Sequence, residues 1–176
     1  MLTIQKITDF DTLTFNWLQT RRLTYSHLAL ISRAISRLGD GLLYAVIGVA
    51  FAVFDAEHGQ AFLVAGLLAF LLELPVYWLL KNTIKRPRPS SLKGFEAVIV
   101  PSDTFSFPSG HSAAAFLFAT LLAVFYPALA GVGYVLAGMI GFSRVMLGVH
   151  YPTDIAAGAA LGICCAELAM LIGFAL

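Results

Sequence analysis

Long apolar stretches, separated by short polar connections, constrain this chain more than any other feature of its sequence. Residues 61–80 and 128–147 contain a single charged residue each. A helix of about 20 mainly apolar residues crosses the hydrocarbon core of a bilayer. Charged residues make up only 12% of the chain, whereas soluble domains carry about 25%. The bilayer is therefore expected to surround most of the molecule.

The sequence predicts an all-α, integral membrane helical bundle that forms one domain over residues 1–176. Residues 41–176 are expected to contain about five transmembrane helices, or six, with polar motifs at their ends. The first and third expected spans are short for a bilayer crossing. The five expected spans are residues 41–54, 61–80, 111–126, 128–147 and 152–176.

The first 38 residues contain no apolar stretch long enough to cross a bilayer. Between Asp9 and Arg37, apolar side chains alternate with basic ones, a pattern typical of an amphipathic helix in the membrane interface. We therefore expect residues 1–38 to be an interfacial segment that anchors the chain and has no catalytic part. The basic residues in this stretch are Arg21, Arg22, Arg33 and Arg37.

The connections between the expected spans differ in length and in charge. Residues 55–60 form a short link, whereas residues 81–110 are long and rich in Pro, Ser, Lys and Arg. Connections of that length are usually functional or disordered. If the spans run up and down, all 11 Lys and Arg residues fall on one membrane face. The net charge is only +1, so nucleic acid is not expected as a partner.

The first polar segment, residues 81–89 (KNTIKRPRP), ends the second expected span. Lys and Arg at a helix end often serve only as interfacial anchors, and for this segment alone that alternative stays open. Pro87 and Pro89, however, stiffen the chain around Arg88. The planar guanidinium of Arg88 suits phosphate oxygens, and Lys81 offers a compact positive charge.

The second polar segment, residues 107–112 (FPSGHS), begins the third expected span. Ser109 is a candidate N-cap, and Gly110 lets the backbone approach a ligand closely. The free N–H groups of a first helical turn form an anion site. His111 could act there as a general acid or base, although an ordinary helix start that contains a histidine is an equal alternative.

The third polar segment, residues 143–154 (SRVMLGVHYPTD), joins the last two expected spans. Arg144 lies within an apolar stretch, where a charge is costly and marks a functional site. Pro152 suits the first position of a helix, which puts Asp154 in the first turn, within reach of His150. Such a carboxylate fixes one imidazole nitrogen and leaves the other free as a nucleophile. The alternative is a plain helix cap beside an interfacial histidine.

The three segments are expected to converge at one end of the bundle, where four anion-binding side chains surround two histidines. The histidines are not spaced as metal ligands, and the nearby carboxylates, Asp154 and Asp103, are too few for a magnesium site. We therefore expect no metal and no cofactor. The cations themselves would stabilise a phosphoryl transition state. The four anion-binding side chains are Lys81, Arg88, Ser109 and Arg144.

These segments resemble the signature of the type 2 phosphatidic acid phosphatases, a family related to the vanadium-dependent haloperoxidases. The family pattern is Lys-x6-Arg-Pro, then Pro-Ser-Gly-His, then Ser-Arg-x5-His-x3-Asp. Residues 81–89, 108–111 and 143–154 match it at every signature position and in order. The haloperoxidases are large and soluble, so the composition excludes that branch. Many family members have six spans, one more than the five counted here.

The resemblance implies a membrane lipid phosphatase that hydrolyses a phosphomonoester or diphosphate headgroup, such as that of phosphatidic acid or phosphatidylglycerol phosphate. It implies that His150 forms a phosphohistidine intermediate and that Asp154 orients it. His111 would protonate the leaving group and then activate water. The lipid phosphate and the bilayer would be the partners. The residues that would hold the phosphate are Lys81, Arg88, Ser109, Gly110 and Arg144.

Two other functions stay open. An undecaprenyl diphosphate phosphatase is the nearer one, although such bacterial enzymes often carry Asp where this chain has Gly110. That difference favours a glycerophospholipid-type substrate. A non-enzymatic lipid or anion transporter would need broken helices and a polar site near the midplane, whereas the polar residues here gather at one end.

The family resemblance and the distribution of basic residues predict opposite orientations of the chain in the membrane. The resemblance implies a bacterial inner membrane with the active site facing the periplasm, whereas the excess of basic residues predicts that this face is cytoplasmic. Glu73 and Glu167 lie within expected spans. Each could line a substrate cavity or bond to a neighbouring helix, and we favour the structural role. The sequence does not indicate an oligomeric state.

Overall fold

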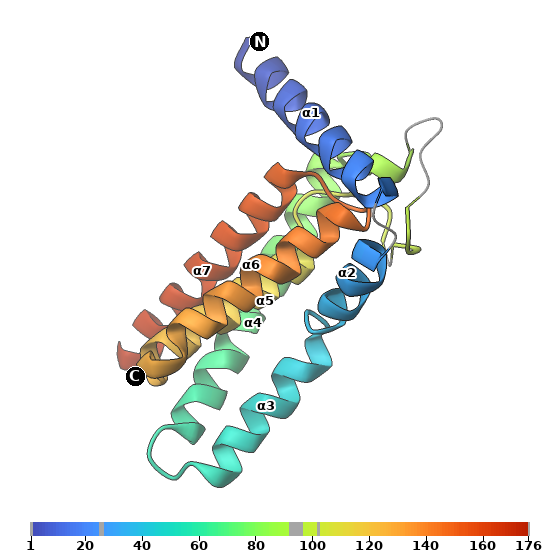
Figure 1. Cartoon of the computed structure of the whole chain (residues 1–176). Helices are drawn as coiled ribbons and strands as arrows, with labels where there is room; N and C mark the ends of the chain where they lie inside the picture. Colours follow the sequence, from blue (N-terminus) through green and yellow to red (C-terminus); the bar gives the residue numbers. More distant parts are fainter. Residues whose placement is uncertain (1, 25–26, 92–96, 102, 176) are drawn as a thin grey trace.

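The computed structural model describes residues 2–24, 27–91, 97–101 and 103–175. Every regular element in these ranges is helical, as the sequence predicts. Short 3-10 turns, η1 (Pro89–Ser91) and η2 (Pro127–Leu129), lie in two of the connections. The α-helices are α1 (Leu2–Thr24), α2 (His27–Arg37), α3 (Gly41–Phe54), α4 (Gly59–Ile84), α5 (Gly110–Phe125), α6 (Ala130–Met146) and α7 (Pro152–Ala175) (Figure 1).

Fewer helices than the expected five have the length and composition of a membrane span. Within the described ranges, three stretches qualify, over residues 59–91, 127–146 and 152–173. α2 and α3 make a fourth if the pair, bent by 47°, is counted as one broken span. The expected third span corresponds to α5, which is apolar but has only 16 residues. The two expected spans that fall outside this set, residues 41–54 and 111–126, are the two that the sequence predicts to be short.

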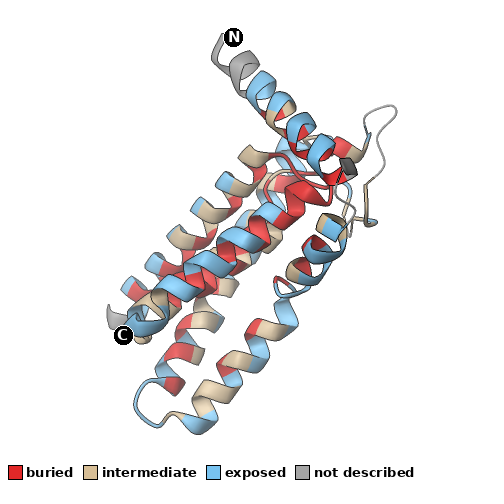
Figure 2. Cartoon of the chain, in the orientation of Figure 1, coloured by how far each residue is buried: buried red, intermediate tan, exposed pale blue. Residues whose placement is uncertain are grey.

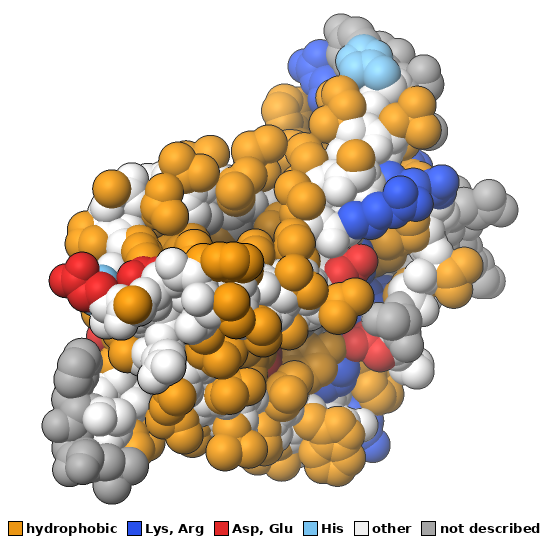
Figure 3. All heavy atoms as spheres, turned by 90° about the horizontal axis from the view of Figure 1, so that it is seen from below, with side chains coloured by type: hydrophobic (Ala, Val, Ile, Leu, Met, Phe, Trp, Pro, Cys, Tyr) orange, Lys and Arg blue, Asp and Glu red, His pale blue; other side chains and the backbone are white. Residues whose placement is uncertain are grey.

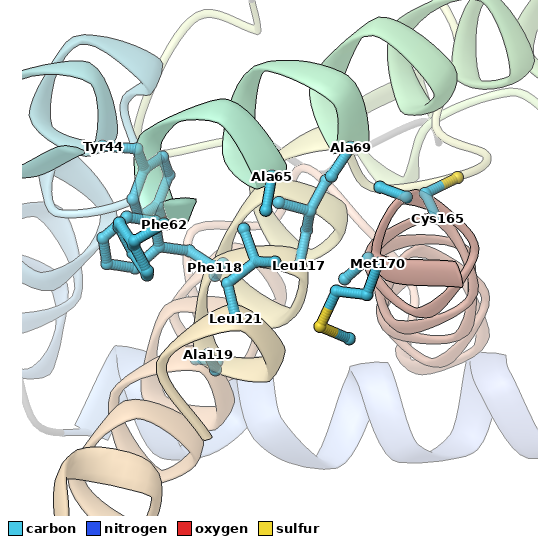
Figure 4. Close-up of a cluster of buried hydrophobic side chains, with 14 of the residues drawn as sticks. Tyr44, Phe62, Ala65, Ala69, Leu117, Phe118, Ala119, Leu121, Cys165 and Met170 are labelled. Atoms are coloured by element: carbon cyan, nitrogen blue, oxygen red, sulfur yellow. The ribbon is translucent and has the colours of Figure 1, made fainter. Parts of the chain in front are cut away.

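α5 can be short because other helices enclose it. It lies in the middle of the bundle and packs against α4, α6 and α7 (Figure 1). Its Leu117 and Leu121 side chains are fully buried. Ala65 and Ala69 of α4 and Met170 of α7 belong to the same buried cluster (Figure 4). Most of the surface of α5 thus contacts protein rather than lipid.

The closest packing in the bundle is between α5 and α7. A Cβ atom on Gly158 would lie 2.4 Å from the carbonyl oxygen of Ser109. A Cβ atom on Gly162 would lie 2.1 Å from the carbonyl oxygen of Ala113. Only glycine permits backbones to approach this closely. This glycine pair, four residues apart, therefore permits the close packing of α5 and α7.

The exterior of the bundle is apolar, as expected for a surface in contact with lipid. Buried residues follow the inward faces of the helices (Figure 2). Exposed apolar side chains such as Leu71, Trp78, Val135 and Leu171 follow the outward faces. Hydrophobic side chains cover most of the face seen in Figure 3, and Lys and Arg side chains gather toward one end. The chain is an integral membrane protein.

The N-terminal residues form two helices rather than one interfacial segment. α2 leads into α3 across the 47° bend and packs against α6. α1 contacts the polar end of the bundle (Figure 1), where Phe15 and Leu18 are buried in a cluster with Tyr151. Ser36 of α2 accepts a hydrogen bond from Arg144. The N-terminal helices therefore contact the polar segments, and the expectation that they have no catalytic part stays a prediction.

Candidate active site

The three polar segments meet at one end of the bundle. α4 and α6 end there and α5 and α7 begin there (Figure 1). Five residues expected to bind phosphate or act on it are each at most 6% exposed. Burial of so many polar groups requires hydrogen-bonding or charged partners, so their contacts define the site. The five residues are Lys81, Arg88, Ser109, Arg144 and His150.

Arg88 joins the first segment to the third. Its Nη1 donates to the carbonyl oxygen of Val149 at 2.6 Å and lies 3.3 Å from Nε2 of His150. Its Nε donates to the carbonyl oxygen of Asp103 at 3.0 Å. The fixed fork of guanidinium N–H groups allows these contacts to be made together. Arg88 thereby places a positive charge beside Nε2 of His150.

The carboxylate of Asp103 contacts two cations of the first polar segment. It pairs with Arg88, accepts from Lys81 Nζ at 2.6 Å and accepts from the Tyr77 hydroxyl at 2.7 Å. Burial raises the pKa of Asp103, but the hydrogen bonds from Lys81 and Tyr77 and the charge of Lys81 outweigh this and lower it to about 2. The sequence indicates Asp103 only as a nearby carboxylate, whereas here it is the counter-ion of two signature cations.

Ser109 caps α5 as the sequence predicts. Its backbone is extended, and its Oγ accepts from the backbone N–H of Ser112 at 3.4 Å. The N–H of Ser109 donates to the carbonyl oxygen of Asp154 at 3.0 Å, which ties the start of α5 to the start of α7. Gly110 is the first residue of α5. A Cβ atom there would lie 3.1 Å from the ring of Tyr77, so a larger residue would crowd the site.

His150 lies at the centre of these contacts. The preceding turn contains Gly148 with φ of 80°, a left-handed conformation that other residues rarely adopt. The His150 side chain is buried, and burial lowers its pKa to about 4. The imidazole is therefore neutral near pH 7. Arg88 lies on its Nε2 side and Asp154 on its Nδ1 side.

Asp154 occupies the position that the sequence predicts. α7 begins at Pro152, and Oδ2 of Asp154 accepts from the backbone N–H of Tyr151 at 2.8 Å. The distance from that oxygen to Nδ1 of His150 is 3.7 Å, which is too long for a hydrogen bond. The carboxylate here acts on the ring through its charge. Contacts of this kind often tighten when substrate binds.

His111 lies in the first turn of α5. Its Nε2 is 3.2 Å from Oδ1 of Asp40, in the connection between α2 and α3. Its side chain is 25% exposed, far more than that of His150. The sequence does not indicate Asp40, because the pairing joins residues 71 apart in the chain. His111 thus has both a carboxylate partner and access from outside.

Arg144 is buried near the end of α6. Its Nη1 donates to Oγ of Ser36 at 2.6 Å. Its Nε has no hydrogen-bond partner among the described residues. A buried N–H donor without a partner is costly, so this side chain retains a donor for an anion. Arg144 is directed into protein and not into lipid.

The described residues contain no group of three or more His, Cys, Asp and Glu side chains arranged to hold a metal ion. The expected absence of a metal stays a prediction. The charges that could stabilise an oxyanion in this site are those of Lys81, Arg88 and Arg144.

A cavity of about 440 Å³ adjoins the site between α3, α4 and α5. Gly110 and His111 line one part of it, and the rest of its lining is mostly apolar. Glu73 lines it too and is only 3% exposed. The structure thus places Glu73 at a cavity, whereas the sequence favours a purely structural role. Glu167 is exposed on α7.

The sequence was compared with models of known protein families to establish its family. Residues 60–176 match the model of the PAP2 superfamily. The chain belongs to the PAP2 superfamily. All three segments of the resemblance lie within the matched residues.

Curated relatives of the chain include lipid phosphatases. The decaprenylphosphoryl-5-phosphoribose phosphatase of Mycobacterium tuberculosis is 32% identical over 139 residues, which cover 74% of this chain and 72% of that protein. Phosphatidylglycerophosphatase B of Bacillus subtilis is 38% identical over 108 residues, 55% of this chain and 51% of that protein.

Solved PAP2 structures share the fold. The crystal structure of Aquifex aeolicus LpxE matches this chain with a TM-score of 0.81 and 25% identity. The match covers 92% of this chain and 95% of the LpxE chain. The structure of the phosphatidylglycerolphosphate phosphatase of Bacillus subtilis matches with a TM-score of 0.76 and 26% identity. This match covers 97% of this chain and 88% of that protein. The likeness to LpxE and to this second protein therefore includes the N-terminal helices.

The PAP2 site also involves residues that the sequence leaves without a firm role. Arg86 lies in the first polar segment, whose Lys and Arg residues could serve only as interfacial anchors. It instead pairs with Asp154 and with Asp11 of α1. Lys85 ends α4 in a left-handed conformation. Lys93 lies outside the described residues.

Proposed function

We propose that this PAP2 protein is a membrane lipid phosphatase that uses His150 as its nucleophile and needs no metal. The observation that carries the proposal is the position of His150 between Asp154 and Arg88. Its Nε2 faces the cations while its Nδ1 faces a carboxylate. This polarity suits a neutral imidazole that attacks an anionic phosphoryl group.

The first chemical step forms a phosphohistidine. Nε2 of His150 attacks phosphorus, the bond from phosphorus to the ester oxygen breaks, and His111 gives that oxygen a proton. The positive charge on the His150 ring is balanced by Asp154. The transition state is loose, and its charge lies on the three equatorial oxygens, which the cations and donors of the site stabilise.

The second step releases phosphate. His111, now unprotonated, removes a proton from a water molecule that attacks the phosphohistidine, and the bond from phosphorus to Nε2 breaks. Asp40 holds His111 in this role from 3.2 Å. The products are inorganic phosphate and a lipid alcohol, and both histidines return to their starting protonation states.

Five residues are proposed to hold the phosphoryl oxygens. Two of them, Lys81 and Arg88, pair with the carboxylate of Asp103 in the structure. The free N–H groups at the start of α5 add a further anion site. Substrate phosphate would take over the contacts that Asp103 makes with the cations. The five residues are Lys81, Arg88, Ser109, Gly110 and Arg144.

The apolar cavity next to His111 supports a lipid as the substrate. A lipid phosphate has one charged end and an apolar remainder, and the cavity joins a largely apolar lining to the catalytic acid. The same site serves phosphatidic acid, phosphatidylglycerol phosphate or a polyprenyl-linked phosphate. Gly110 favours the glycerophospholipids.

A substrate panel tests the proposal. Purified protein in detergent with EDTA is given each lipid phosphate, and released phosphate is measured for wild type and for His150→Ala. We expect release by wild type without added metal and a loss of several orders of magnitude in the variant. Activity retained by His150→Ala, or abolished by EDTA, would contradict the mechanism.

We also propose that the protein lies in a bacterial inner membrane with the site facing the periplasm. Lys81, Arg88 and Arg144 serve the phosphate, so they are poor markers of orientation. Arg33 and Arg37 favour the opposite orientation. An impermeant thiol reagent tests this with single cysteines in α2, after both native cysteines have been replaced. Labelling in intact cells supports a periplasmic site.

A further inference from the structure

A buried carboxylate of α1 is bonded directly to the catalytic end of the bundle. Asp11 is fully buried although α1 precedes every signature segment. Its Oδ1 accepts from the backbone N–H of Thr153 at 3.0 Å. Its Oδ2 accepts from Arg86 Nη2 at 2.6 Å and from the Thr153 hydroxyl. A buried charge with so many partners is fixed in position.

Arg86 also bonds to Asp154 and thereby connects it to Asp11. Its Nη1 donates to Oδ1 of Asp154 at 2.8 Å and to Oγ1 of Thr153 at 2.8 Å. Its guanidinium carbon lies 4.2 Å from the ring centre of Tyr151. Arg86 is thus held between two buried carboxylates and an aromatic face. It touches neither the phosphate site nor His150 in the described contacts.

The two oxygens of Asp154 have different partners as a result. Oδ1 is taken by Arg86, and Oδ2 accepts from the Tyr151 N–H and faces Nδ1 of His150. A carboxylate held at both oxygens cannot rotate about its own axis. The arrangement therefore determines which oxygen faces the nucleophile and at what distance.

Other contacts hold α1 in this place. The rings of Phe15 and Tyr151 meet edge to face with centres 5.7 Å apart. The side chain of Gln19 donates to the carbonyl oxygen of Val145 at 2.7 Å, near the end of α6. These residues, with Asp11, lie on one face of α1 at a spacing of four. α1 is therefore docked by polar contacts in addition to the hydrophobic cluster that contains Phe15 and Leu18.

We infer that α1 acts as an intramolecular support for catalysis, in which Asp11 holds Arg86 so that Arg86 orients Asp154 against His150. The inference rests on the proposed role of His150 as nucleophile. Arg86 and Asp11 are positioning residues, because they act through Asp154 and do not touch the reacting atoms. Their loss affects kcat and leaves KM for the lipid phosphate unchanged.

The charges of Arg86 and Asp11 have opposite effects on the protonation of His150. This difference makes the proposed role of α1 testable. Replacing Arg86 by Gln leaves the charge of Asp154 less neutralised, so imidazolium forms more readily. The acidic limb of kcat/KM then moves to higher pH. Replacing Asp11 by Asn leaves Arg86 to pair with Asp154 alone, and the limb moves to lower pH. Arg88 and Arg144, the other charged groups that act on His150, stay the same in both variants.

The experiment compares Arg86→Gln, Asp11→Asn and the control Asp9→Asn in the full-length protein. Asp9 is an exposed carboxylate on the same helix. We expect kcat to fall about tenfold in Arg86→Gln, similar to the lower end of the loss when an outer partner of a metal-bound histidine is removed. The fall in kcat should be smaller in Asp11→Asn, and kcat of Asp9→Asn should equal that of wild type. Arg86→Lys should restore part of the activity.

The outcomes separate this inference from the proposed function. Melting temperatures that fall in both variants, with kcat and the pH profile unchanged, would show that the contacts only hold α1 in place and would overturn the inference. Shifts of the pH limb in the same direction would overturn it too. If Arg86→Gln does not fold, Arg86→Lys and Asp11→Asn provide the comparison. Activity retained by His150→Ala would instead refute the proposed mechanism.

Discussion

At the scale of single residues, Asp103 gives two proposed phosphate-binding cations an anionic partner from within the chain. Its carboxylate pairs with Lys81 and Arg88, the cations proposed to bind phosphate. A substrate phosphate must therefore compete with an anion that belongs to the chain. The side chain of Asp103 is 32% exposed, so the ion pairs are partly screened and the competition is modest.

The substitution Asp103→Asn tests this competition. The amide keeps the shape but removes the charge, so phosphate no longer competes with a carboxylate. We expect KM for the lipid substrate and Ki for inorganic phosphate to fall up to about fivefold, which corresponds to about 1 kcal/mol. Both constants can be measured from phosphate release. Glu57→Gln, at an exposed carboxylate between α3 and α4, is the control. Unchanged constants in Asp103→Asn would show that Asp103 does not oppose binding.

His150 couples the stability of the protein to pH. Its pKa is about 4 in the folded chain because it is buried, whereas an unfolded histidine titrates near 6.5. Between these values the unfolded chain binds a proton that the folded chain does not. The stabilisation is therefore fully present above pH 6.5 and is lost as the pH falls toward 4.

We therefore expect a larger fall in melting temperature between pH 7 and pH 5 for wild type than for His150→Gln. The difference in free energy of unfolding is at most about 2 kcal/mol over this range. Thermal scans in one detergent, with the two proteins side by side, measure it. Equal pH dependence would show that His150 is not buried as a neutral ring.

The signature residues could be predicted from the sequence because their spacing is local. A proline at the first helical position determines where Asp154 lies relative to His150, and Ser109 caps its own helix. The partners Asp11, Asp40 and Asp103 could not be predicted, because their contacts join segments far apart in the chain. No helical or strand period relates such residues. Long-range ion pairs depend on the whole arrangement of helices.

At the scale of elements, the contact between α5 and α7 sets the geometry of the site. Ser109 and Asp154 lie at the starts of these two helices and are joined by a backbone hydrogen bond of 3.0 Å. The glycines at 158 and 162 allow the helices to approach each other just below that bond. The distance between the helices and the position of the catalytic carboxylate are therefore linked.

Gly162→Ala should loosen this contact. Its methyl group would lie 2.1 Å from the Ala113 carbonyl oxygen, so the helices must separate. We expect a loss of about 1–3 kcal/mol in stability, as for other overpacked sites, together with a lower kcat. Gly173→Ala on the same helix is the control, since a Cβ there meets nothing within 4 Å. Gly162→Ala with wild-type melting temperature and activity would contradict a packing role.

The lengths of the elements were harder to predict than their existence. The sequence predicts the region of α5 correctly but treats it as a full crossing, because apolar content alone does not reveal that neighbouring helices enclose it. It also assigns α2 to an interfacial segment. α2 is amphipathic, and it continues into α3 and supplies Ser36 to Arg144. Tertiary packing decided both cases.

At the scale of the whole molecule, the apolar cavity adjoins the cationic end at Gly110 and His111. The cations are proposed to hold the headgroup, and the cavity between α3, α4 and α5 offers a mostly apolar space beside it for the lipid portion. Filling the cavity should therefore affect only substrates with long chains. This separates binding of the lipid portion from the chemistry of the phosphate.

Gly66→Phe fills the cavity from α4. Gly66 lines it, and a Cβ there would have its nearest neighbour at 3.7 Å, an ordinary contact with Leu121. We expect KM for dioleoyl phosphatidic acid to rise about tenfold, as the burial of a few methylene groups is worth roughly 1–2 kcal/mol. KM for the dihexanoyl analogue should change little, and kcat should be kept for both. Gly138→Phe, at an open position on α6, controls for the added ring. An equal rise for both chain lengths would mean that the cavity does not hold the acyl chains and that the lipid portion stays in the bilayer while its phosphate reacts.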